Sequence, residues 1–265
     1  MLRRRRRLAA AVVGITALIV AALVLGGSHG APRAPAADQD PAALLPDPVA
    51  PAFKPTLRPA DFTTPASRWA PVVRPAEATR VPGGRAPIAR LATSTPEGTA
   101  NMVLLQPGVR VVHGRMWVRV RLPVLPNNTT GWVRRDVLGG YGEVRTRLVV
   151  DRRLLTARLL RDGREIFRAR VGVGAPRWPT PSGDFYIRNK LTTFDDAFYG
   201  PVAFGTSARS AVLTDWPAGG FIGIHGTNRP DLLPGRVSHG CIRMANDDIL
   251  RLARLMPVGT PVTIH

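Results

Sequence analysis

Short runs in which apolar and polar positions alternate mark the chain from residue 86 onwards. Between residues 116 and 121, Met116, Val118 and Val120 alternate with tryptophan and arginine. A period of two predicts a strand with one buried face. The stretch PNNTTG (126–131) then predicts a loop, and GWVRRDVL (131–138) predicts another short strand followed by a turn. These few short strands indicate a small β-barrel over residues 86–142.

Residues 143–265 are also rich in strand patterns. The runs LLTARLL (154–160) and EIFRARV (165–171) flank the dipeptide Asp162-Gly163, which is typical of a tight hairpin turn. A segment of roughly 120 residues can bury a core of its own. We therefore expect a second, larger domain that is mainly β.

The end of this segment predicts one helix that is preceded and followed by a strand in the sequence. GGFIGIHG (219–226) predicts a strand that ends at a histidine, and GTPVTIH (259–265) predicts the last strand. Between them, NDDILRLARLM (246–256) predicts a helix with Asp247 as a candidate cap. The expected apolar face of this helix consists of Ile249, Leu250, Leu252, Leu255 and Met256.

The first 30 residues predict a signal anchor or a signal peptide. Arginines occupy positions 3–7, and an uncharged, almost wholly apolar run of 18 residues (8–25) follows. That length is at the lower limit for a membrane-spanning helix and exceeds the usual apolar core of a cleaved signal peptide. A buried soluble helix is the third reading. With the arginines held in the cytoplasm, the first two readings place the rest of the chain on the extracytoplasmic face of the membrane or in the cell wall.

Residues 31–85 hold 12 of the 26 prolines and 13 alanines. Proline removes backbone donors, so we expect an extended linker with polyproline-II character between the membrane and the ordered domains.

The formal net charge is +19, and nearly all of the basic residues are arginines. They are spread along the chain and form no basic block with interleaved aromatics beyond the first seven residues, so a nucleic-acid partner is not expected. Outside the membrane, a cationic surface favours contact with lipid head groups and acidic cell-wall polymers.

Cys241 is the single cysteine of the chain, so no internal disulfide can form. A lone cysteine in an exported protein is either a small buried apolar residue or a reactive thiol. The thiolate is the nucleophile, and a neighbouring base or cation must remove the thiol proton or stabilise the charge. His225 and His239 lie within sixteen positions upstream, and Arg243 follows two positions later. These residues indicate cysteine acyl transfer.

Three sequence motifs, which occur in a fixed order, resemble those of a known protein family. VGVGAPRWPTPSGDFYI (171–187), IHGT (224–227) and SHGCIRM (238–244), followed by the closing strand, resemble the L,D-transpeptidases of the YkuD family. The match spans about residues 144–265. Residues 86–139, which include a Gly-Trp-Val, resemble a bacterial SH3-like domain. The resemblance implies an SH3-like barrel followed by a YkuD-like β-sandwich with one or two short helices.

The same resemblance assigns roles to the residues. It makes Cys241 the nucleophile and His225 its base, with the carbonyl of Gly226 orienting the imidazole.

It also has Ser238, His239 and Gly240 shape the loop before the cysteine, with backbone N–H groups near His239, Gly240 and Cys241 as the oxyanion hole. Arg243 stands where some members have asparagine, and it is expected to support the site or to meet a substrate carboxylate.

The implied reaction is peptidoglycan 3→3 cross-linking. The thiolate attacks a tetrapeptide stem and releases D-alanine, and an amine of a second stem then resolves the thioester. No metal or organic cofactor is expected, and the chain is expected to act as a monomer. An L,D-carboxypeptidase side activity is compatible with the same site.

Three other classes of protein were weighed. A papain-like endopeptidase places its histidine after its cysteine, but only His265 follows Cys241. A zinc peptidase lacks ligand spacing here, because no carboxylate cluster accompanies the histidines. A non-catalytic wall-binding scaffold would use the smaller domain, where Trp117 and Trp132 are either core or ligand-contact residues.

Overall fold

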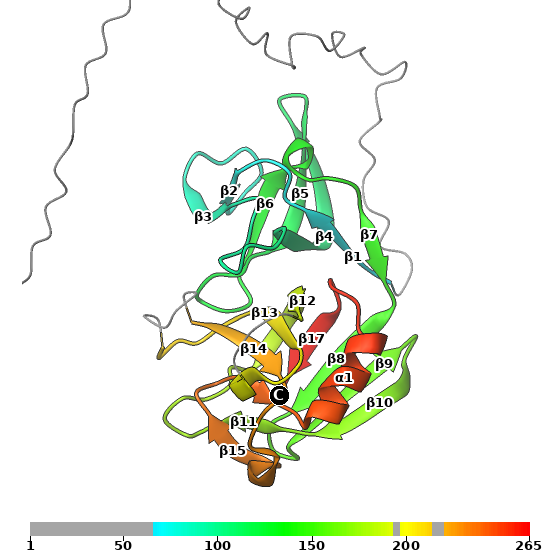
Figure 1. The fold of residues 1–265 in the computed structure, drawn as a ribbon. Helices are drawn as coiled ribbons and strands as arrows, with labels where there is room; N and C mark the ends of the chain where they lie inside the picture. The colour runs from blue at the N-terminus through cyan, green and yellow to red at the C-terminus, as the bar shows by residue number, and fades with distance from the viewer. Residues whose placement is uncertain (1–65, 193–196, 214–219) are drawn as a thin grey trace, which may run out of the picture. The chain divides into compact units, whose positions relative to one another are not determined.

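The computed structural model describes residues 66–192, 197–213 and 220–265. The expected membrane segment at residues 8–25 and most of the expected linker lie outside this part. Within it, no helix has the length and apolar character needed to span a membrane. The described residues are mainly β, as expected, with two sheets and a single α-helix (Figure 1).

The first sheet has seven antiparallel strands in the order β3-β2-β6-β5-β4-β1-β7. Their bounds are β1 Ser67–Pro71, β2 Ala76–Thr79, β3 Pro87–Leu91, β4 Met102–Val112, β5 Arg115–Arg121, β6 Thr130–Arg134 and β7 Gly142–Val144. The period-two prediction is confirmed in β5, where Val118 and Val120 are buried and Arg119 is exposed. Whether this sheet is an SH3-like barrel stays a prediction.

The expected linker over residues 31–85 is wrong for its last twenty residues. Strands β1 and β2 lie within that range, and Ala70 and Val72 belong to the core of the first sheet. The prolines do not prevent strand formation, because they lie at positions where the sheet needs no hydrogen bond from a backbone N–H. Pro71 ends β1, and its carbonyl accepts a hydrogen bond from Gly139 N–H at 2.9 Å.

The second sheet has ten strands in the order β10-β9-β8-β17-β12-β13-β14-β16-β11-β15. Their bounds are β8 Thr146–Asp151, β9 Thr156–Arg161, β10 Arg164–Arg170, β11 Gly172–Gly174, β12 Gly183–Leu191, β13 Ala203–Arg209, β14 Phe221–His225, β15 Gly235–Ser238, β16 Ile242–Arg243 and β17 Pro261–Ile264. The predicted hairpin turn is present between β9 and β10, where Asp162 and Gly163 have φ values of 50° and 80°.

The helix α1, Asn246–Leu255, packs against the core of the second sheet through buried Ile249 and Leu252 (Figure 1). Two details of its prediction are wrong. Leu250 is 38% exposed, because it points away from the stripe formed by its neighbours. The N-cap is Ala245 and Asp247 lies in the first turn instead, where its charge favours the positive end of the helix dipole.

The two sheets belong to one compact unit and contact each other directly. Tyr186 of β12 is fully buried, and its hydroxyl donates to the carbonyl of Met102 in β4 at 3.1 Å. The indole of Trp69 lies against Gly142 and Gly259, where any side chain would collide with the ring. These contacts join the start of the first sheet to the middle of the second.

A buried ion pair adds to this contact. Arg188 of β12 donates to both carboxylate oxygens of Glu97 at 3.1 Å, and Asn189 donates to the same carboxylate at 3.1 Å. The Arg188 side chain is 2% exposed and that of Glu97 is 21% exposed. The carboxylate therefore compensates a guanidinium that water does not reach.

We expect Glu97→Ala to lower the free energy of unfolding by about 3 kcal/mol, because it leaves the Arg188 charge buried and unpaired. Urea unfolding of the purified protein measures this. Glu77→Ala is the matched control: its pair with Arg90 is largely exposed, and its removal should cost less than about 1 kcal/mol. Equal losses in the two variants would contradict a structural role for the buried pair.

Candidate active site

The register of two short parallel strands places the candidate catalytic residues. In β14 and β16, Ile224 pairs with Ile242 and His225 pairs with Arg243. Both isoleucines are fully buried in the core. Because side chains alternate along a strand, His225 and Arg243 project from the opposite face. Cys241, one residue before Ile242, points to that same face.

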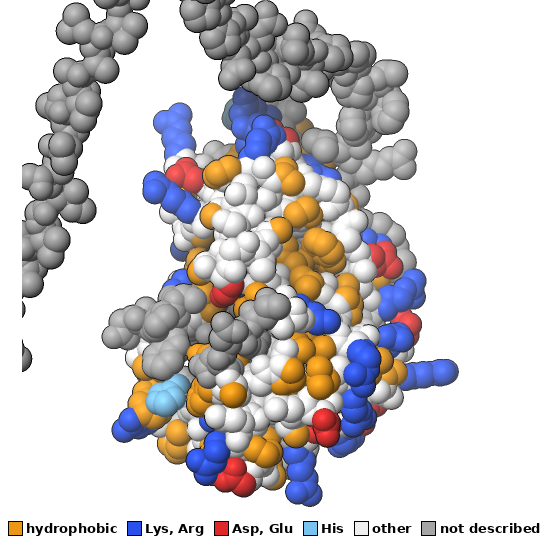
Figure 2. Space-filling view, in the orientation of Figure 1, with side chains coloured by type: hydrophobic (Ala, Val, Ile, Leu, Met, Phe, Trp, Pro, Cys, Tyr) orange, Lys and Arg blue, Asp and Glu red, His pale blue; other side chains and the backbone are white. Residues whose placement is uncertain are grey.

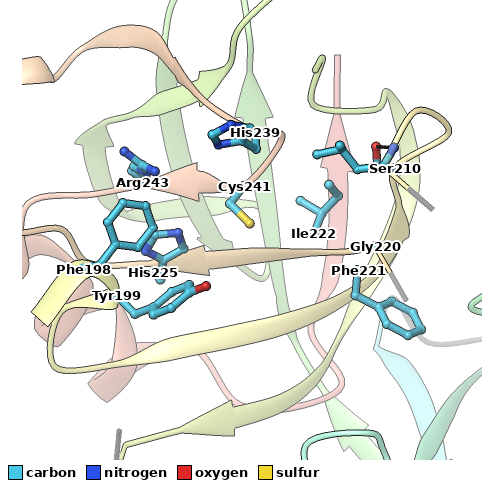
Figure 3. A pocket seen from close by; sticks show the side chains of 11 residues that line it. Phe198, Tyr199, Ser210, Gly220, Phe221, Ile222, His225, His239, Cys241 and Arg243 are labelled. Atoms are coloured by element: carbon cyan, nitrogen blue, oxygen red, sulfur yellow. Dashed lines mark hydrogen bonds between the residues drawn. The ribbon is translucent and has the colours of Figure 1, made fainter. Parts of the chain in front are cut away.

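Gly223 faces the thiol from the neighbouring strand. Its N–H donates to Cys241 Sγ at 3.3 Å, and a Cβ at this position would lie 3.7 Å from the sulfur and 3.9 Å from His225 Cδ2. The thiol and the imidazole therefore both lie next to the position that a side chain at Gly223 would occupy, and both line the same cavity (Figure 3). An N–H directed at the sulfur favours the thiolate over the thiol.

His225 is held in one tautomer. Its ring is 1% exposed, and its Nδ1 lies 2.6 Å from the carbonyl oxygen of Gly226. Since a carbonyl only accepts, Nδ1 carries the proton and Nε2 keeps its lone pair. The contact expected between Gly226 and the imidazole is present. A second contact fixes this corner: the Asn246 side chain, at the start of α1, accepts the Thr227 N–H at 2.9 Å.

Burial favours the neutral form of both the Cys241 thiol and the His225 imidazole. Burial lowers the pKa of His225 to about 4; the Gly226 carbonyl opposes this shift and the Arg243 charge adds to it. Burial also raises the pKa of the Cys241 thiol, while the Gly223 N–H and Arg243 act in the opposite direction. At neutral pH the pair is a thiol beside a neutral imidazole, which can accept the thiol proton as the sulfur attacks.

The turn before the cysteine is fixed by two hydroxyl groups. Ser238 Oγ donates to the Cys241 carbonyl at 2.5 Å and accepts the Gly240 N–H at 3.0 Å. Thr180 Oγ donates to the Gly240 carbonyl at 2.7 Å and accepts the Gly174 N–H at 2.9 Å. Gly240 has φ +116°, a conformation open to glycine.

These bonds change one expectation about the oxyanion hole. The Gly240 N–H is engaged by Ser238, so it does not fit the expected role of an oxyanion donor. Gly240 instead allows the turn to form. The N–H groups of His239 and Cys241 stay the candidate donors.

His239 occupies a different environment from His225. It is exposed at the edge of the cavity, and its ring centroid lies 3.9 Å from that of Trp178. The guanidinium of Arg177 covers the indole, with Cζ 3.4 Å from the ring centroid. Trp178 was not among the candidate residues, although it belongs to the motif that precedes β12.

A cavity of about 140 Å³ opens in front of the thiol. Phe198 and Tyr199 line it on the His225 side, and Ile222 and Phe221 line it on the other side of Cys241 (Figure 3). The Tyr199 ring meets the His225 ring edge-on, with centroids 5.0 Å apart. Sequence reasoning missed these aromatic residues, since Phe198 and Tyr199 come from a segment without a strand or helix pattern.

Comparison with known proteins identifies the domain around this cavity. The family model of the YkuD L,D-transpeptidase catalytic domain matches residues 145–264. This segment is similar to the YkuD L,D-transpeptidase catalytic domain over nearly its whole length. YkuD of Bacillus subtilis is 40% identical over 95 residues, and YkuD of Bacillus licheniformis is 36% identical over 118 residues.

These matches cover part of each protein. They span 36% and 44% of this chain, and the chain spans 51% and 64% of the two YkuD relatives. Among solved structures, an Enterococcus faecium L,D-transpeptidase mutant is 24% identical, with a TM-score of 0.37, over 46% of this chain and 50% of its own. The family model and the curated relatives confirm the expected resemblance of residues 144–265 to the YkuD family.

No group of three His, Cys, Asp or Glu in the described part of the chain is arranged to hold a metal ion. Basic side chains are spread over the visible face of the molecule and do not gather in one patch (Figure 2).

The depressed pKa of His225 predicts how stability changes with pH. The unfolded chain binds a proton near pH 6.5, whereas the folded L,D-transpeptidase domain does so near pH 4. The contribution to stability is present above pH 6.5 and is lost as the pH falls to about 4. Relative to His225→Gln, the wild type should lose about 3 kcal/mol between about pH 7.5 and about pH 4. Urea unfolding at each pH measures the difference, and parallel pH profiles of the two proteins would contradict the assignment.

Proposed function

We propose that this chain is a peptidoglycan L,D-transpeptidase that forms 3→3 cross-links by cysteine acyl transfer. One observation carries the proposal. The Cys241 thiol and the His225 imidazole lie on the same face of the paired strands β14 and β16. The imidazole is neutral, and its hydrogen bond to the Gly226 carbonyl fixes its tautomer. The L,D-transpeptidase family of residues 145–264 supplies the substrate class.

In the first step, Cys241 Sγ attacks the carbonyl carbon of the third stem residue. The thiol proton passes to His225 Nε2, and the carbonyl oxygen becomes an oxyanion near the Cys241 N–H. The C–N bond then breaks, His225 returns the proton to the leaving nitrogen, and D-alanine departs. A thioester between the enzyme and the stem remains.

In the second step, the side-chain amine of another stem attacks the thioester. His225 accepts a proton from that amine and returns it to the leaving sulfur. The new amide joins two third-position residues, and the free thiol is restored. Atoms and charges balance over the cycle with no added oxidant, reductant or metal.

The neutral resting pair supports this sequence. A general base is effective when it is unprotonated at working pH and lies within reach of the proton it removes. A pKa of about 4 keeps the His225 imidazole unprotonated in the neutral range. The Gly223 N–H and Arg243 then stabilise the developing thiolate.

We further propose an extracytoplasmic location, with residues 8–25 as a membrane anchor or export signal and the following segment as a spacer. The net charge of +19 favours attraction to acidic wall polymers. Peptidoglycan stems are the proposed partners, and the chain acts as a monomer.

We expect the full-length protein, incubated with a disaccharide-tetrapeptide, to yield a dimer that is lighter by one alanine, detected by mass spectrometry. Cys241→Ala should abolish it, because no other thiol exists in the chain. His225→Gln should lower the rate by about 10²- to 10⁴-fold, the usual contribution of a general base.

The matched control is His113→Gln. His113 is an exposed histidine between β4 and β5, in the other sheet, and the variant should keep the wild-type rate. Monomer that merely loses alanine would assign an L,D-carboxypeptidase activity instead. Full activity in Cys241→Ala would refute acyl transfer through this thiol.

A further inference from the structure

We propose that Thr180 is a positioning residue for the oxyanion hole. Its hydroxyl holds the peptide unit between Gly240 and Cys241 in the orientation that directs the Cys241 N–H towards the oxygen of the attacked carbonyl. This inference rests on the proposed function and deepens it, because it gives a role in acyl transfer to a residue outside the catalytic pair.

The Thr180 hydroxyl is held in a single orientation. Thr180 is 1% exposed, and its Oγ accepts the N–H of Gly174 at 2.9 Å and donates to the carbonyl of Gly240 at 2.7 Å. A hydroxyl has one proton, so the Gly174 N–H occupies a lone pair and the proton points to Gly240. Gly174 ends β11, which pairs with β15. The hydroxyl is therefore anchored to the sheet that carries the turn.

The Gly240 carbonyl and the Cys241 N–H belong to one rigid unit. The peptide between them is trans, and a planar trans peptide directs its C=O and its N–H to opposite sides. With the carbonyl held by Thr180, the N–H points away from the buried side where Thr180 lies. The described residues that line the cavity include Cys241 and do not include Thr180. The N–H is thus directed to the side from which a donor carbonyl approaches the thiol.

The two neighbouring peptide units are held by a different residue. Ser238 Oγ accepts the Gly240 N–H and donates to the Cys241 carbonyl, so it fixes the units before and after the one that Thr180 holds. Gly240 has φ +116°, and a glycine can rotate where other residues cannot. Loss of the Thr180 hydroxyl therefore releases the unit that carries the candidate oxyanion donor.

The same bond strengthens that donor. A proton donated to an amide oxygen polarises the amide, and hydrogen bonds in a chain reinforce one another at a buried site. Attack of the thiolate on a carbonyl creates an oxyanion that the Cys241 N–H stabilises. Alkylation of the same thiolate creates no oxyanion. The role of Thr180 should therefore appear in acylation and not in alkylation.

The test measures both reactions on the full-length wild type, Thr180→Val and Thr180→Ser. In acylation by p-nitrophenyl acetate, the bond from sulfur to the carbonyl carbon forms, the ester C–O bond breaks, and p-nitrophenolate leaves as the thiol proton passes through His225 to solvent. In alkylation by iodoacetamide, a bond from sulfur to carbon forms and iodide leaves. Each rate is corrected for the rate of Cys241→Ala, and the ratio of acylation to alkylation cancels changes in the amount of thiolate.

Thr180→Val should lower this ratio by about 10- to 100-fold, somewhat less than the roughly 10²- to 10³-fold loss when an oxyanion donor is removed outright. Thr180→Ser keeps the hydroxyl and should keep most of the ratio. With a disaccharide-tetrapeptide, Thr180→Val should lower kcat and leave KM unchanged.

Thr146→Val is the matched control. Thr146 in β8 is 5% exposed, and its Oγ is hydrogen-bonded to the Oγ of Thr260 at 2.7 Å. The variant removes a buried hydroxyl from the same sheet and should leave the ratio at the wild-type value. An equal fall of both rates in Thr180→Val would overturn the proposal, since a merely structural role predicts that result. A Thr180→Ser ratio as low as that of Thr180→Val would overturn it as well.

A measurement on the wild type alone covers the case in which Thr180→Val does not fold. N-acetylalaninal adds to the Cys241 thiol and leaves an oxygen where the oxyanion forms. The amide proton of Cys241, followed by NMR, should then move downfield, and an unchanged resonance would overturn the proposal.

These outcomes are independent of peptidoglycan. If the wild type joins no stems while the acylation ratio responds to Thr180 as expected, the proposed cross-linking fails and the oxyanion hole stands. If stems are joined and the ratio does not respond, only the role of Thr180 fails.

Discussion

The candidate site depends on one constraint, the parallel register between β14 and β16. Because Ile224 and Ile242 are buried opposite each other, the residues before and after them must face the cavity. A shift of one residue would put the thiol into the core and an isoleucine into the cavity. The apolar core therefore sets the catalytic geometry, and the short turn before Cys241, held by Ser238 and Thr180, protects it.

Burial explains why the role proposed for His225 is that of a general base. In an open site a cysteine and a histidine can exchange a proton at rest and form a charged pair. Here the low polarity around both groups disfavours either charge, and the proton stays on the sulfur at neutral pH. Arg243, which carries a permanent charge among the described residues that line the cavity, disfavours a proton on His225 and favours negative charge on the sulfur.

Much of this was accessible from sequence, because strand periodicity, the Asp162-Gly163 turn and the spaced motifs are local signals. The start of the first sheet was not, since a proline-rich composition conceals strands whose prolines sit at the ends. The engagement of the Gly240 N–H and the aromatic wall of the cavity depend on contacts between distant segments. Leu250 shows the same limit. Periodicity assigned it to the apolar face of α1, but in the structure its side chain is exposed to solvent.

The buried ion pair between the sheets also affects the shape of the cavity. The Arg188 guanidinium that Glu97 compensates also lies over the ring of Phe221, with Cζ 3.7 Å from the centroid, and Phe221 forms a wall of the cavity. The first sheet thus contributes to the shape of the catalytic cavity without supplying any residue that touches the thiol. Without the segment that carries Glu97, the Arg188 guanidinium behind Phe221 would lose its carboxylate partner. In this architecture the first sheet is part of the framework that shapes the candidate site.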